Sequence, residues 1–133
     1  MRNNDIDEIF DMLSWNNNVD TQQAGIYAAG KIQNISVLFQ PNESKAIWQN
    51  CAIVISQKGD EKLSRYIYDM FCWLQDMNWP GAEIIYDRLL KMPYDWIENT
   101  FLHCMRVAEL SLDTSWLGAL KQFEKDLQQQ KNT

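Results

Sequence analysis

The chain has 133 residues, of which 46% are hydrophobic, including six Trp, five Tyr and five Phe. This length and apolar content suit one domain, residues 1–133, around a single core, and they exclude a disordered chain. A net charge of −6 disfavours non-specific binding to nucleic acid or to an anionic membrane, since both carry charge of the same sign.

Several local features predict a cytoplasmic protein. Residues 1–5 are polar and acidic and lack the apolar stretch of a secretory signal. The longest apolar run, residues 52–55, is far shorter than the roughly 18 residues that a membrane span needs. Cys51, Cys72 and Cys104 fall in apolar helical patterns without the spacing of metal ligands, which predicts reduced core thiols.

Apolar residues recur at helical spacing along almost the whole chain, and this predicts seven helices and an all-α fold. The first covers about residues 5–15. The second begins near Asp20, which is expected to cap it together with Gln23. The predicted buried faces of these two helices are Ile6, Ile9, Phe10 and Leu13 in the first and Ala24, Ala28, Ile32 and Ile35 in the second.

Residues 37–41 are the one segment with extended character, because they are apolar and precede Pro41. Asn42 is expected to cap a third helix that Gly59 ends, and Asp60 is expected to start a fourth. The fourth has the clearest apolar stripe in the chain: Leu63, Ile67, Met70, Phe71 and Leu74.

Pro80 is expected at the first position of a fifth helix, which Pro93 closes. A sixth helix covers about residues 94–112, and Asp113 caps a seventh that ends in a frayed tail at about residues 128–133. The predicted inward residues are Ala82, Ile85, Tyr86 and Leu89, then Ile97, Phe101, Cys104 and Ala108, then Trp116, Leu120, Phe123 and Leu127.

Short connections predict antiparallel helical hairpins. Pairing the first helix with the second, the third with the fourth and the fifth with the sixth gives units of roughly 35 to 40 residues, near the length of HEAT-type repeats. Both a HEAT-like α-solenoid and an irregular helical bundle fit this pattern.

The sequence contains little that indicates catalysis. The single histidine, His103, is adjacent to Cys104, but neighbouring helical residues point about 100° apart and do not meet. Glu83 and Asp87 share a helical face, yet no second histidine is available to complete a metal site with them. No phosphate-binding loop or nucleophile elbow occurs. We expect no enzymatic activity, no metal and no cofactor. A minor enzyme or metal carrier that uses Glu83, Asp87 and His103 is the remaining alternative.

The most distinctive stretch is WLQDMNWPGA at residues 73–82, where the fourth helix ends and the fifth begins. Asp76 is placed to accept from free amides of the next helix, Asn78 suits a turn, and Trp79 can pack across the helix start. These features predict a tight structural corner. Alternatively, Asp76, Asn78 and Trp79 form a polar and aromatic patch for a partner.

With this corner, the chain resembles a family of small bacterial all-helical proteins, catalogued as a domain of unknown function, that share a WLQDMNWP-like motif. Residues 13–17, 35–41 and 48–52 also resemble members of that family. The resemblance covers most of residues 9–127, and it implies an immunity protein encoded beside a polymorphic toxin.

The implied mechanism is neutralisation of a cognate toxin by direct binding, and an acidic inhibitor associates fast with a basic toxin cleft through electrostatic steering. The alternative is a helical-repeat scaffold or adaptor that binds a housekeeping protein or a peptide. Neither function predicts the oligomeric state. The candidate partner-binding residues are Trp48, Asp76, Asn78, Trp79, Glu83, Asp87 and Trp96.

Overall fold

The computed structural model describes residues 3–131, which confirm the all-α prediction. The seven predicted helices are present when the single turn α4, the 3-10 turn η3 and α5 are taken together as one. The α-helices are α1 Asn3–Met12, α2 Val19–Ala29, α3 Trp48–Ser56, α4 Asp60–Leu63, α5 Ile67–Trp73, α6 Ala82–Leu90, α7 Tyr94–Leu110 and α8 Thr114–Lys131. The 3-10 turns are η1 Ile35–Leu38, η2 Lys45–Ile47 and η3 Ser64–Tyr66.

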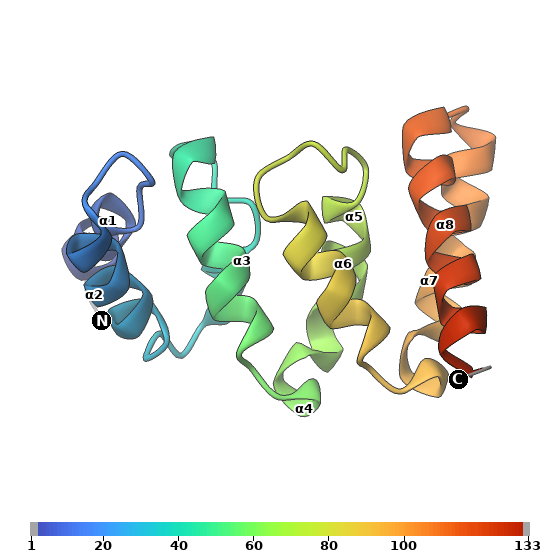
Figure 1. The fold of residues 1–133 in the computed structure, drawn as a ribbon, viewed down its shortest axis with the longest axis horizontal. Helices are drawn as coiled ribbons and strands as arrows, with labels where there is room; N and C mark the ends of the chain where they lie inside the picture. Colours follow the sequence, from blue (N-terminus) through green and yellow to red (C-terminus); the bar gives the residue numbers. More distant parts are fainter. Residues whose placement is uncertain (1–2, 132–133) are drawn as a thin grey trace.

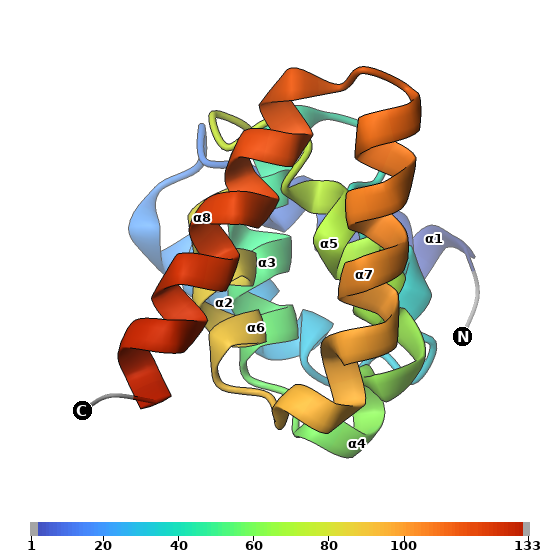
Figure 2. The same ribbon diagram turned by 90° about the vertical axis from the view of Figure 1, so that its right-hand side faces the viewer.

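The helices stand side by side in two layers (Figure 1). One layer holds α2, α3, α6 and α8 in that order, and α3 packs between α2 and α6. The other layer holds α1, α5 and α7, as the turned view in Figure 2 also shows. Opposite α3, the second layer has no full helix, because η1 and η2 pack against α3 there.

The hairpin pairing differs from the predicted one beyond the first pair. The packed hairpins are α1 with α2, α5 with α6, and α7 with α8. The prediction paired the third helix with the fourth because short links favour antiparallel neighbours and because the resulting units have about the length of HEAT-type repeats. Residues 35–38 instead form η1, and this turn takes the place beside α3 that a helical partner would fill.

The predicted caps of the second and third helices are wrong. Asn18, not Asp20, caps α2, because its side chain accepts from the Thr21 amide at 2.8 Å. Ser44, not Asn42, caps the turn that leads into α3, since its hydroxyl accepts from the Ala46 amide at 3.0 Å.

The buried face of α2 is also rotated from the predicted one. Gly25 and Ala29 are buried, whereas Ala24 is exposed and Ala28 is half-buried. Gly25 faces the end of α1 closely: a Cβ built on it would lie 2.8 Å from the Cβ of Met12. The close approach of these two helices therefore requires a residue without a side chain at this position.

The C-terminal half follows the sequence pattern more closely. All five apolar residues of the predicted fourth stripe are buried, as are the predicted residues of α7 and α8. Asp113 caps α8 as predicted, accepting from the Trp116 amide at 3.0 Å. The helix α8 extends to Lys131, and residues 132–133 lie outside the described part, so the fraying of residues 128–133 stays a prediction.

The core is continuous along the row of helices. At its C-terminal end, the rings of Phe71, Phe101 and Phe123 meet with centroids 5.4–5.8 Å apart. The indole of Trp116 is buried and donates to the Phe71 carbonyl at 2.9 Å, which joins α8 to α5. Within residues 3–131, no helix combines the length and the apolar character that crossing a membrane requires.

Candidate protein-binding surfaces

The corner at residues 74–81 is closed by its own hydrogen bonds. The Asp76 carboxylate accepts from the Asn78 amide at 2.8 Å, and the Asp76 carbonyl accepts from the Trp79 amide at 3.0 Å. Asp76 therefore forms a local turn and does not cap the next helix as predicted. The helix α6 begins at Ala82, not at Pro80, and the amides at its start bond to other groups: Gly81 donates to the Gln49 side chain and Ala82 to the Trp79 carbonyl.

Three tryptophans from α3, α5 and the corner pack together beneath this turn. The Trp48 ring meets Trp73 edge-on at 6.1 Å and Trp79 edge-on at 5.7 Å between centroids. The Trp73 indole donates to the Pro80 carbonyl at 3.0 Å, and the Trp48 indole donates to the Pro41 carbonyl at 2.7 Å. Two of the predicted partner-binding aromatics, Trp48 and Trp79, thus pack against each other within the fold.

Gly81 joins the corner to α6 in a conformation that favours glycine. Its φ is +87°, and a Cβ built there would lie 2.7 Å from the Ala52 Cβ and 3.0 Å from both the Trp48 carbonyl oxygen and a Trp73 ring atom. Its amide donates to the Gln49 side chain of α3 at 2.8 Å. The start of α6 is therefore held directly against α3.

Glu83 and Asp87 are exposed on α6 and border a hollow of about 340 Å³ between α6 and α8, which we call the α6–α8 hollow. Asp126 of α8 faces them across it and accepts from the Tyr86 hydroxyl and, at 3.1 Å, from Gln122. No Lys or Arg lines the hollow, whose residues are Met77, Glu83, Tyr86, Asp87, Ala119, Gln122 and Asp126.

Arg88, the residue after Asp87, pairs with Asp60 and does not line this hollow. Its guanidinium lies 2.7 Å from the Asp60 carboxylate and donates to the Lys58 carbonyl at 2.8 Å. The α6–α8 hollow is therefore lined by three carboxylates and no Lys or Arg, an arrangement that favours a cationic group of a partner.

The ionisation of Tyr86, which lines the α6–α8 hollow, affects the stability of the fold at alkaline pH. Burial and the hydrogen bond to Asp126 raise the pKa of the Tyr86 phenol above its ordinary value of 10.0. Above about pH 10 the unfolded chain releases this proton while the folded chain keeps it, so the free energy of unfolding falls as the pH rises. We expect the stability advantage of the wild type over Tyr86→Phe to shrink between about pH 9 and pH 11.5, measured by urea unfolding. A constant difference in the free energy of unfolding between the two proteins over this range would contradict the raised pKa of Tyr86.

Trp96 and Asn78 lie apart from the hollow. The Trp96 side chain is 43% exposed near the start of α7, in the other layer from α6 and α8. Asn78 is exposed at the tip of the corner, where its backbone closes the turn. The structure thus groups Glu83 and Asp87 in one hollow and leaves the other predicted residues in the corner or on a separate helix.

The three cysteines are free thiols that lie in or beside the core: Cys51 and Cys104 are buried and Cys72 is half-buried. Burial raises the pKa of Cys51 and of Cys104 to about 12, and it also raises the pKa of the half-buried Cys72. A thiol with a raised pKa is a weak nucleophile at neutral pH, because little thiolate forms. Among residues 3–131, no cluster of three or more His, Cys, Asp or Glu side chains is placed to hold a metal ion.

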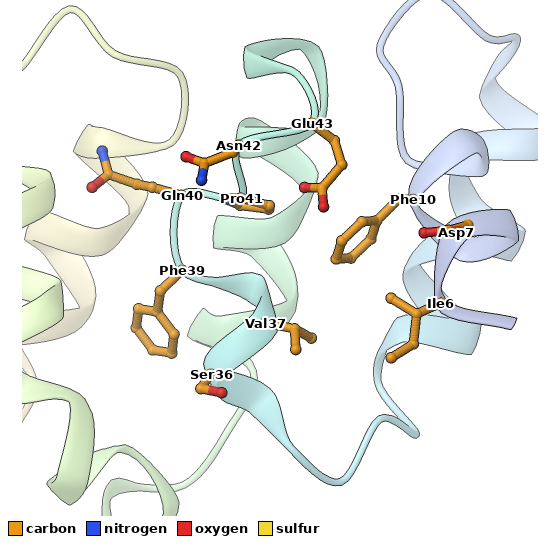
Figure 3. Close-up of a pocket in the computed structure, with 10 residues that line it drawn as sticks. All are labelled: Ile6, Asp7, Phe10, Ser36, Val37, Phe39, Gln40, Pro41, Asn42 and Glu43. Atoms are coloured by element: carbon orange, nitrogen blue, oxygen red, sulfur yellow. The ribbon is translucent and has the colours of Figure 1, made fainter. Parts of the chain in front are cut away.

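A second acidic surface lies between α1 and residues 36–47, and sequence reasoning missed it. Two adjoining hollows of about 500 and 430 Å³ share Asp7, Phe10 and Glu43, and together we call them the α1 groove. Figure 3 shows Ile6 and Phe10 of α1 facing Val37 across it, with Glu43 reaching over the Phe10 ring. The i, i+4 pair Asp7 and Asp11 was its one signal in the sequence, since Glu43 is far along the chain.

Comparison with known proteins identifies one relationship. The model of a protein family described as a domain of unknown function, DUF5071, matches residues 48–131, which is more than half of the chain. This stretch includes the corner and the whole α6–α8 hollow, whereas the residues that line the α1 groove all lie before it. No curated protein and no solved structure matches the chain.

Proposed function

We propose, from the premise that this chain belongs to the DUF5071 family, that it is a non-catalytic bacterial immunity protein of the cytoplasm. It neutralises a cognate toxin by binding it directly, with hairpins stacked in the manner of HEAT-type repeats as a rigid support for the contact surface. No cofactor takes part.

The observation that carries this proposal is the α6–α8 hollow. Glu83 and Asp87 are exposed on a helix that Gly81 holds against α3, so the carboxylates are presented from a fixed frame. The neighbouring Arg88 is engaged with Asp60. An uncompensated acidic surface on a rigid element attracts a basic partner and needs little reorganisation on binding.

The proposed mechanism is occlusion. Toxin domains that cleave nucleic acid need a basic cleft to hold the phosphate backbone. An acidic protein that occupies such a cleft excludes the substrate without any chemical step, and long-range attraction raises the association rate.

The test is a pull-down from the native host with the tagged protein, followed by mass spectrometry of what remains after a salt wash. We expect one product of a neighbouring gene with a toxin-like C-terminal domain. Recovery of a housekeeping protein would favour the scaffold function, and it would overturn the immunity proposal.

Binding kinetics with the recovered partner then test the surface. We expect the double variant Glu83→Gln, Asp87→Asn to slow association several-fold at low salt, because rim charges act mainly on the association rate. The control Glu61→Gln, Asp69→Asn removes the same charge from exposed positions outside the hollow. Equal slowing in both variants would mean that overall charge, and not this surface, attracts the partner.

A further inference from the structure

The α1 groove exists because one layer of the fold lacks a helix. In the layer of α1, α5 and α7, the place opposite α3 is filled by η1, η2 and the loop between them (Figure 1). Two short turns cover less of the neighbouring helix than a full helix does. The backbone bond from the Trp15 amide to the Ala46 carbonyl, at 3.0 Å, ties the α1–α2 loop to this segment.

The groove has an apolar floor. Ile6, Val37 and Phe39 pack on the core but remain partly exposed, and the Phe10 ring stands beside them (Figure 3). Phe10, Pro41 and Ile47 are buried and support this floor from below. A floor of this kind suits the apolar face of an added helix.

The rim of the groove carries acidic side chains whose charge no Lys or Arg of the groove offsets. Asp7, Asp11 and Glu43 are exposed, and none of them forms an ion pair within the described residues. No Lys or Arg lines either hollow of the groove. Lys45 is the one cation of residues 36–47, and its ammonium lies over the Trp48 ring, 5.7 Å from the centroid.

We propose that the α1 groove binds an amphipathic, cationic helical segment of a partner protein. Apolar side chains of that segment lie on the floor, and its Lys or Arg side chains meet Asp7, Asp11 and Glu43. A second copy of this chain fits poorly, because its net charge is −6, and nucleic acid carries the same sign of charge. The inference rests on the proposed function in that it gives the partner protein a second contact, away from the α6–α8 hollow.

A peptide titration tests the groove without the native partner. The probe is a synthetic amphipathic helix of about 14 residues, long enough for i, i+3, i+4 and i+7 anchors, with a Leu/Trp face and a Lys face. A second peptide carries Glu in place of Lys. We expect the Lys peptide to bind the full chain at concentrations below about 1 mM and the Glu peptide not to bind. Amide NMR shifts are expected in α1 and residues 36–47.

Two matched triple variants provide the control. We expect Asp7→Asn, Asp11→Asn, Glu43→Gln to weaken binding about tenfold, and Glu61→Gln, Asp69→Asn, Asp95→Asn to weaken it less than about twofold. All six positions are exposed, so both variants are expected to fold. Absence of binding to the Lys peptide, equal weakening by both triples, or shifts centred elsewhere would overturn the inference. Since the host pull-down is a separate measurement, its failure would count against the proposed function and not against the peptide site.

Discussion

Replacing Gly81 with Ala is expected to lower the free energy of unfolding by about 3 kcal/mol, because a Cβ there adds both overpacking and left-handed strain. The strain arises from φ +87°, and the overpacking arises from contacts of 2.7–3.0 Å with Ala52, Trp48 and Trp73. Neither term is easily relieved, since one close atom is backbone and another belongs to a buried ring. Urea unfolding at neutral pH measures the change.

The matched control is Gly118→Ala. Gly118 lies inside α8, and a Cβ built on it would meet nothing within 4 Å. Alanine in a helix interior is better than glycine by about 0.5–1 kcal/mol, so this variant should be more stable than the wild type. If both substitutions change stability by the same amount, the close packing at the corner is not what Gly81 provides.

Replacing Trp73 with Ala is expected to lower the free energy of unfolding by about 3–5 kcal/mol. The ring is fully buried, lies edge-on to Trp48 and Phe39, and donates to the Pro80 carbonyl. Its loss leaves a cavity where α3, α5 and the corner meet. Denaturant unfolding followed by circular dichroism gives the value.

A milder substitution tests the same packing if Trp73→Ala does not fold. Trp73→Phe retains an aromatic ring but leaves the Pro80 carbonyl without its donor, and we expect a loss of about 1–3 kcal/mol. Trp96→Ala, at a 43% exposed ring, is expected to stay within about 0.5 kcal/mol of the wild type. A loss at Trp96 as large as that at Trp73 would contradict this assignment of the core.

The helices whose start and face depend on local signals could be predicted from the sequence. The stripe from Leu63 to Leu74 is buried as expected, and Asp113 caps α8 because its acceptor lies three residues from the amide that it binds. Such signals act within one or two turns, so periodicity and capping rules can detect them, but where two capping residues lie close together, as Asn18 and Asp20 do, these rules do not decide between them.

The parts that depend on distant contacts were not predictable in this way. The segment before α3 forms 3-10 turns, and its position is fixed by the Trp48 indole on Pro41 and by the Trp15 amide on Ala46. The start of α6 moves past Pro80 because Gln49, 32 residues earlier, accepts from the Gly81 amide. Local rules contain no information about either partner.

The same distinction applies to the candidate surfaces. The sequence indicates that Glu83 and Asp87 share a helical face, but Asp126 joins them only through the packing of α8 on α6. Asp7 and Asp11 likewise gain Glu43 only through the fold. An acidic pair at helical spacing thus predicts part of each surface, and tertiary structure supplies the hollow.

The buried side chain of Asn50 in α3 joins the first hairpin, α1 and α2, to the rest of the fold. Its amide nitrogen donates to the Leu13 carbonyl at 2.7 Å and to the Gln22 side chain at 2.9 Å, so one side chain fastens the first hairpin to α3. The helix α1 packs chiefly on α2 at the end of the row (Figure 1). In hydrogen exchange we therefore expect the amides of this hairpin to open as one cooperative unit before those around Phe71, Phe101 and Phe123, and we expect Asn50→Ala to speed their exchange.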